Sequence, residues 1–148
     1  MELLKLAALD DEDLQVISAH MQDAVLKVGD MSYLPSKARF VMVANRFDWP
    51  AARRSAADKP RRARTGLHFE RVLSVKSRNI RTQARDGVLS LLAITFTPDD
   101  EPPGGVIELI FSGDGIIRLQ VECVEAWLED LGQMWETSSI PDHDTGDE

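Results

Sequence analysis

The sequence predicts an α+β fold: a curled antiparallel sheet of six to seven strands, with an N-terminal helix and a C-terminal capping helix. Three observations predict it. Two short apolar runs with alternating polarity flank a Gly-Asp-Gly turn, a helical apolar pattern follows the second run, and another helical pattern lies near the N-terminus. Sequential strands joined by short turns favour an antiparallel meander over a parallel sheet.

The two apolar runs, Val106–Phe111 and Ile116–Val121, carry their apolar side chains mainly at odd positions. This alternation is typical of half-buried antiparallel strands. Opposed residues share a sheet face, so we expect Leu109 opposite Leu119, across a three-residue loop that ends at Gly115. Such a loop predicts a positive φ at Gly115, and a cost of ~1 kcal/mol or more for Gly115→Val.

The spacing of apolar residues changes after the second run. They recur at intervals of three, four and one, with acidic residues between them: Val121, Val124, Trp127, Leu128, Leu131 and Trp135. This pattern predicts a helix that closes the sheet and buries Trp127, so that Trp127→Ala would cost ~3–5 kcal/mol. The alternative is a detachable arm that binds a partner and leaves Trp127 exposed.

The N-terminal half predicts a helix over Asp11–Val28, which Asp10 caps and Gly29 ends. The expected strands before the central hairpin lie at 3–7, 31–34, 39–47, 67–76 and 88–97. Arg71 interrupts the apolar face of the fourth, which indicates a bulge or a strand end with a charge at the rim.

Length and composition predict one domain over residues 1–136, with a mobile basic loop at 50–65 and a disordered acidic tail at 137–148. The single Cys123 cannot form an internal disulfide. The sequence shows no export signal and no apolar run of ~20 residues, so we expect a cytoplasmic protein without membrane contact. The sequence leaves the oligomeric state open.

The charge is unevenly distributed. The chain carries −8 overall, but the window from Arg53 to Arg85 contains eleven basic and two acidic residues, which gives it +9. This window could bind the phosphates of nucleic acid, although the rest of the chain carries −17 and would repel them. The competing interpretation is a basic segment that neutralises acidic neighbours or the acidic surface of a partner.

Few residues suggest chemistry. The histidines, His20, His68 and His143, are not spaced as metal ligands, and no motif implies a cofactor, so we expect neither. His68 and Glu70 share a strand face and could act as an acid–base pair. An exposed polar face is the favoured interpretation of these two residues.

The best candidate for a site is the end of the strand at 39–47. Arg46, Phe47, Asp48 and Trp49 combine both charges with two aromatic rings, and Arg71 adds a nearby rim charge. Exposed aromatic residues beside arginine are enriched in binding hot spots. The competing interpretation is that the two aromatic rings complete the core.

Five segments carry a resemblance to a known family: AALDDEDLQVISAHMQDAVLKVGDMSYLP, RFDWP, RTGLHFERVLSVKSRNI, LSLLAITF and IRLQVECVEAWLEDLG. Together they resemble an alphaproteobacterial family of unknown function, of about the length of this chain. Because that family has no established activity, the resemblance implies no catalytic residues.

The predicted topology is similar to a pleckstrin-homology-like barrel, in which a curled sheet ends in a C-terminal helix. The likeness concerns topology alone, and fold does not imply function. The alternative architecture is an open α+β sandwich with both helices on one sheet face. We expect a small cytoplasmic, non-catalytic module that binds a protein partner. The alternatives are a nucleic-acid-binding protein that uses residues 53–85, and an enzyme.

Overall fold

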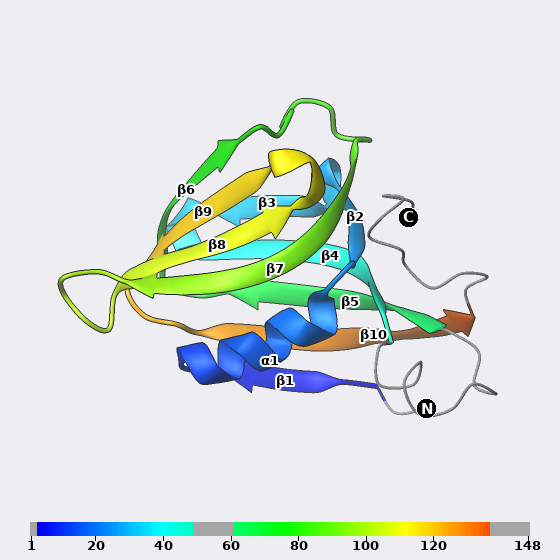
Figure 1. The fold of residues 1–148 in the computed structure, drawn as a ribbon, viewed down its shortest axis with the longest axis horizontal. Helices are drawn as coiled ribbons and strands as arrows, with labels where there is room; N and C mark the ends of the chain where they lie inside the picture. Colours follow the sequence, from blue (N-terminus) through cyan, green and yellow to red (C-terminus); the bar gives the residue numbers. More distant parts are fainter. Residues whose placement is uncertain (1–2, 49–60, 137–148) are drawn as a thin grey trace.

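The computed structural model describes residues 3–48 and 61–136, which form one antiparallel sheet of ten strands and one α-helix (Figure 1). The elements in chain order are β1 (Lys5–Ala8), α1 (Asp11–Met21), β2 (Val25–Lys27), β3 (Met31–Leu34), β4 (Arg39–Phe47), β5 (Arg61–Phe69), β6 (Val72–Arg78), β7 (Val88–Pro98), β8 (Gly105–Phe111), β9 (Ile116–Val121) and β10 (Ala126–Glu136).

The sheet is open and strongly curled. Its strand order is β1-β10-β5-β4-β2-β7-β8-β9-β6, and β3 pairs with β4 outside this path. The short strand β2 joins two halves, because it pairs with β4 on one side and with β7 on the other. Figure 1 shows the half made by β6 to β9 lying across the half made by β3, β4, β5 and β10. The curl therefore gives each strand an inner face and an outer face.

The core fills the space between the two halves. One half contributes Met42, Leu67 and Phe69, and the other contributes Ile107 and Leu119, all of which are buried. Alternation along each strand explains this arrangement, since every second side chain faces inward. Burial of these side chains is the main source of stability.

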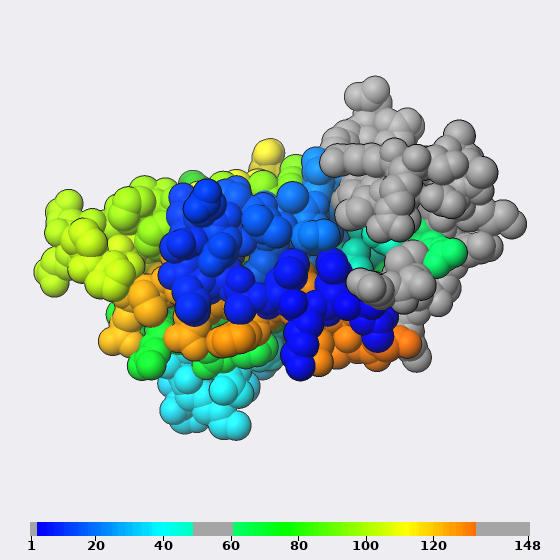
Figure 2. All heavy atoms as spheres, turned by 90° about the horizontal axis from the view of Figure 1, so that it is seen from below, coloured from blue at the N-terminus to red at the C-terminus, as the bar shows by residue number. Residues whose placement is uncertain are grey.

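Helix α1 lies between β7 and β1 and belongs to the same core. As predicted, Asp10 caps it, accepting a hydrogen bond of 2.8 Å from the backbone N–H of Asp13. On its inner side the Ser18 hydroxyl accepts a 2.9 Å bond from the N–H of Ile94 in β7. Seen from below, α1 and β1 lie beside β10 (Figure 2).

The helix is shorter than predicted, because it ends at Met21 and not at Val28. Asp23 has a φ of +66°, which turns the chain. Its N–H then donates to the carbonyl of Leu91, and the N–H of Leu91 donates to Ala24. Bonds to the neighbouring strand β7 replace the helical ones, so the apolar residues after Met21 enter the core from a strand.

The predicted C-terminal helix is wrong. Residues 126–136 form strand β10, which lies between β1 and β5 and bonds to both. A fold of six to seven strands with a capping helix is therefore overturned by ten strands and, in the described residues, a single helix. The sandwich with two helices fails for the same reason, and the structure does not confirm a pleckstrin-homology-like barrel.

The central hairpin, β8–β9, exists as predicted, with its apolar faces aligned. Its register differs by two residues, since Leu109 lies opposite Ile117 and not opposite Leu119. The loop is Ser112–Asp114, closed by a 2.8 Å hydrogen bond from the N–H of Phe111 to the carbonyl of Gly115. The turn therefore begins one residue earlier than the sequence suggested.

The predicted positive φ at Gly115 is also wrong. This residue is extended with a φ of −74°, whereas Gly113 and Asp114 adopt +77° and +67°. The reason for glycine at position 115 is space, because a Cβ there would lie 2.9 Å from Cγ1 of Ile80. The position excludes side chains by packing and not by backbone conformation.

The hairpin β3–β4 and the strand β7 occupy the predicted segments. The strand expected at 67–76 is divided into β5 and β6 by a turn in which Arg71 has a φ of +61°, so this residue marks a strand end. Residues 61–65 of the expected mobile loop begin β5. The rest of that loop and the tail at 137–148 lie outside the described residues.

Candidate functional site

An apolar groove lies on the outer face of the sheet, over strands β4, β5 and β10. Register places Trp127 beside His68 and His68 beside Val41 in one outward row. The next outward row contains Glu129, Gly66 and Val43. The groove therefore runs along β5, with β10 and β4 as its walls.

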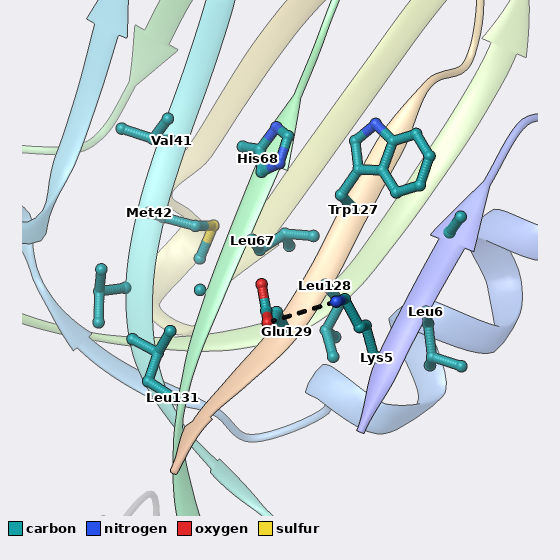
Figure 3. A pocket seen from close by; sticks show the side chains of 13 residues that line it. Lys5, Leu6, Val41, Met42, Leu67, His68, Trp127, Leu128, Glu129 and Leu131 are labelled. Atoms are coloured by element: carbon teal, nitrogen blue, oxygen red, sulfur yellow. Dashed lines mark ion pairs between the residues drawn. The ribbon is translucent and has the colours of Figure 1, made fainter. Parts of the chain in front are cut away.

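Gly66 lies in the floor of the groove, and Cδ2 of Leu131 lies 3.7 Å from the place that a Cβ at Gly66 would take, so Leu131 borders the space above it. The groove has a volume of about 590 Å³ and is lined mainly by apolar residues (Figure 3). Trp127 and Leu131 stand on the β10 side with 41% and 51% of their surface exposed. Ligand sites in proteins typically have volumes of roughly 300–1,000 Å³, so the groove is large enough to hold several side chains.

The charged residues of the groove pair with each other. Nζ of Lys5 lies 3.8 Å from Oε2 of Glu129 across the boundary between β1 and β10 (Figure 3). Both side chains are exposed, so this ion pair is solvated and screened. The pair leaves the middle of the groove without an uncompensated charge of its own.

A second polar group borders the groove at His68. Its Nδ1 lies 2.6 Å from Oε2 of Glu70, and the same oxygen accepts a 2.7 Å hydrogen bond from Nε of Arg39. This contact agrees with the expectation that His68 and Glu70 lie on the same face. The carboxylate holds the imidazole in place, and the guanidinium in turn holds the carboxylate.

The inner face of the same strands carries a buried ionic cluster centred on Asp130. Arg46 donates two hydrogen bonds to it, from Nε at 2.8 Å and Nη2 at 2.7 Å. The Thr65 hydroxyl and the backbone N–H of Leu4 each add a 2.7 Å bond. The cluster thus ties together β4, β5, β10 and the segment that leads into β1.

This environment lowers the pKa of Asp130. Burial alone would raise the pKa, because it disfavours the charged carboxylate. The hydrogen bonds from Arg46, from the backbone of Leu4 and from Thr65 outweigh burial, and the positive charge of Arg46 adds to them. Asp130 therefore stays ionised inside the protein.

Two buried side-chain nitrogen atoms lack hydrogen-bond partners among the described residues: Nη1 of Arg46 and Nδ1 of His20. Oδ1 of Asp48 lies 4.0 Å from Nη1 of Arg46. Burial lowers the pKa of His20, and the charge of Arg46 lowers it further, against the opposing charges of Asp48 and Asp130. The His20 ring is therefore held in its neutral form.

The structure separates the residues that the sequence singled out. Arg46 is 1% exposed, and Phe47 and Asp48 are also buried, so these three lie inside the protein. Trp49 lies outside the described residues. Arg71 lies at the turn between β5 and β6, where its exposed side chain approaches Glu125 at 3.5 Å. A binding role for this set stays a prediction.

The basic window is also dispersed. Arg62 is buried, Arg64 lies 4.0 Å from Asp30, and Arg71 approaches Glu125. Four exposed cations remain together in sequence, on β6 and the link that follows it: Lys76, Arg78, Arg81 and Arg85. The described part of the window therefore does not form one continuous basic surface.

Sequence reasoning missed the groove because it placed Trp127 and Leu131 on a helix. Every second residue from Trp127 to Leu131 faces the groove, but apolar and acidic residues lie on both faces of β10, so its sequence shows no period-2 pattern. Gly66 was the available signal, since a glycine inside a strand often marks a close approach of other groups.

Within residues 3–48 and 61–136, no group of three His, Cys, Asp or Glu side chains is arranged to hold a metal ion. His143 lies outside these ranges. None of the helices in the described part of the chain is long and apolar enough to cross a membrane.

The fold and the groove define a class: a small α+β protein whose curled antiparallel sheet carries an apolar groove on its outer face. The chain belongs to the family "Protein of unknown function (DUF2948)", whose model matches residues 4–143. The predicted membership of a family of unknown function is thereby confirmed, while its alphaproteobacterial origin stays a prediction. No curated protein and no solved structure matches the chain.

Proposed function

We propose that this protein is a non-catalytic interaction module, which holds an uncharged apolar segment of a protein partner in the outer groove. The observation that carries the proposal is the groove itself, where exposed Trp127 and Leu131 stand beside the hollow over Gly66. Exposed tryptophan is enriched among the residues that dominate binding energy.

The charge pattern supports an uncharged occupant. Lys5 and Glu129 neutralise each other, and Glu70 is paired with Arg39 and His68. A charged group placed in the apolar middle would lose hydration without gaining a partner. An apolar segment instead gains by covering Trp127 and Leu131.

The groove is better suited to binding than to catalysis. His68 has an orienting carboxylate, as a general base requires. However, no serine, threonine or cysteine is among the described residues that line the groove, so His68 has no hydroxyl or thiol nucleophile beside it there.

The groove is also a better supported surface than the end of β4. Arg46, Phe47 and Asp48 would have to be uncovered before they could contact a partner. Uncovering Arg46 would break its bonds to Asp130, whereas the groove residues are accessible in the folded protein.

Site-specific photo-crosslinking in cells tests this proposal. A photoreactive residue at Leu131 should give a discrete protein adduct, and one at Val88, which is 59% exposed on β7, should not give it. Gly66→Val fills the hollow and should abolish the adduct. A Cβ at Gly66 meets Cδ2 of Leu131 at 3.7 Å, an ordinary contact, so the variant should fold.

The outcomes are distinct. Adducts that are identical from Leu131 and Val88, or that persist in Gly66→Val, would overturn the groove as the binding surface. An adduct with nucleic acid from Lys76 or Arg78, but with no protein from Leu131, would favour the nucleic-acid alternative.

A further inference from the structure

We propose that the groove recognises a tyrosine side chain of the partner protein, whose phenolic hydroxyl donates a hydrogen bond to Nε2 of His68. This inference rests on the proposed function and specifies the chemistry of the group that occupies the hollow. It follows from the position of the proton on His68, from the direction of its ring and from the character of the groove walls.

Glu70 decides where the proton lies. Its Oε2 accepts from Nε of Arg39 at 2.7 Å, and it lies 2.6 Å from Nδ1 of His68. An ionised carboxylate can only accept hydrogen bonds, so in the neutral ring Nδ1 carries the hydrogen. Nε2 is then left as an acceptor, and it is complementary to a donor on the occupant.

The direction of the ring follows from the order of residues along β5. Glu70 comes two residues after His68, beyond the end of the strand, and Gly66 comes two residues before it. The Nδ1 edge therefore faces Glu70 and away from the hollow, which leaves the Nε2 edge for the groove. His68 lines this groove and its side chain is 39% exposed (Figure 3).

The residues that line the groove favour an aromatic ring as the group that fills it. An aromatic ring placed in the groove beside Gly66 has Trp127 on the β10 side, Val43 on the β4 side and Leu131 next to Gly66. Aromatic pairs gain energy beyond simple burial. Tyrosine carries its donor at the tip of a rigid ring, in line with the groove, so one side chain can fill the hollow and reach His68.

The test compares three probes in titrations of the full chain, followed by NMR at pH 8. N-acetyl-tyrosinamide carries the donor, N-acetyl-phenylalaninamide lacks the hydroxyl, and N-acetyl-O-methyltyrosinamide keeps the oxygen but lacks the hydrogen. The tyrosine probe should bind about three- to tenfold more tightly than either control, as one net hydrogen bond predicts. The shifts should centre on Gly66, His68 and Trp127.

Two variants separate recognition from folding. His68→Phe keeps an aromatic ring but removes the acceptor, so all three probes should bind equally. In Glu70→Gln, either the carbonyl or the amide of the new side chain can face Nδ1 of His68. The hydrogen is then no longer fixed on Nδ1, so Nε2 is no longer always an acceptor. The preference for the tyrosine probe should therefore become smaller. Both positions are on the outer face, and Arg39 is exposed enough to be solvated when Glu70 changes.

Each result decides between the two proposals. Equal binding of all three probes, all at Gly66 and Trp127, would overturn tyrosine recognition and leave the interaction groove standing. A preference for tyrosine that persists in His68→Phe, or an Nε2–H tautomer of His68 in the ¹⁵N spectrum, would also overturn it. If none of the probes changes the NMR chemical shift of any groove residue, both proposals would be overturned.

Discussion

Glu129 and Asp130 are consecutive acids on β10, and they show how different the two faces of one strand are. The Asp130 side chain is fully buried and accepts four hydrogen bonds, two of them from Arg46. The Glu129 side chain is 59% exposed, and its partner among the described residues is Lys5, at 3.8 Å. The inner acid holds strands together, while the outer acid only borders a groove.

The charge of Asp130 is buried and contributes to stability, whereas the charge of Glu129 is accessible to solvent. Removal of one member of a buried ion pair leaves an uncompensated charge in a medium that cannot solvate it. A solvated pair loses little, because water replaces the missing partner. The inner face should therefore control stability and the outer face should control recognition.

Arg46→Ala should have the largest effect. It leaves the Asp130 carboxylate buried without its main partner, which typically costs about 3–5 kcal/mol. Urea denaturation measures this loss. The matched control is Lys5→Ala, which removes the outer partner and should cost less than about 0.5 kcal/mol. Losses of similar size in the two variants would mean that the faces do not differ as proposed.

Asp130→Asn should have the next largest effect, and that effect should depend on pH. The folded pKa lies below the ordinary value, so the ionised carboxylate stabilises the fold above the unfolded pKa, and this stabilisation is lost as pH falls through the folded pKa. At pH 7 the variant should lose about 2–3 kcal/mol.

The difference between wild type and Asp130→Asn should narrow below about pH 4, where the unfolded aspartate begins to protonate. Urea midpoints at pH 7, 5, 4 and 3 measure this difference. A difference that stays constant down to pH 3 would show that the charge of Asp130 is not what the cluster requires.

Trp127→Ala should cost less stability than Arg46→Ala or Asp130→Asn, about 1 kcal/mol, because 41% of its surface is already exposed. The same variant should lose the crosslinked adduct described above. Thermal melting and crosslinking of one preparation test both statements. A loss of about 3–5 kcal/mol would instead match the buried tryptophan expected from the sequence.

The residues that form the ion pair and the groove on β10 are also the reason why the sequence predicted a helix there. A half-buried strand normally places apolar residues inward and polar residues outward. In β10 the inward set contains Asp130, and the outward set contains Trp127 and Leu131. Asp130 on the inner face, and Trp127 and Leu131 on the outer face, therefore break the alternation of polarity, and the spacing of the apolar residues resembles that of a helix. Local patterns fail where function or a buried polar network overrides them.

Elsewhere the local signals were sufficient. Asp10 caps α1 through its own side chain, and the hairpin across Pro35–Lys37 is set by a short polar turn. Both depend on neighbours in sequence. The register of β8–β9 was missed by two residues because the turn could begin at Ser112 or Gly113, and both choices keep the same faces. The Arg46–Asp130 pair joins strands that are distant in sequence, so no local sequence pattern predicts it.

The pairing of β1 with β10 has a consequence for the order of events during synthesis. Leu4 and Asp130 bond directly although 126 positions separate them. A ribosome therefore releases β1 long before its partner strand β10 exists, and the edge of β5 stays open to other strands meanwhile. The wall that carries Trp127 is the last part of the groove to be made. The groove proposed as the binding surface is therefore complete only after β10 has been synthesised.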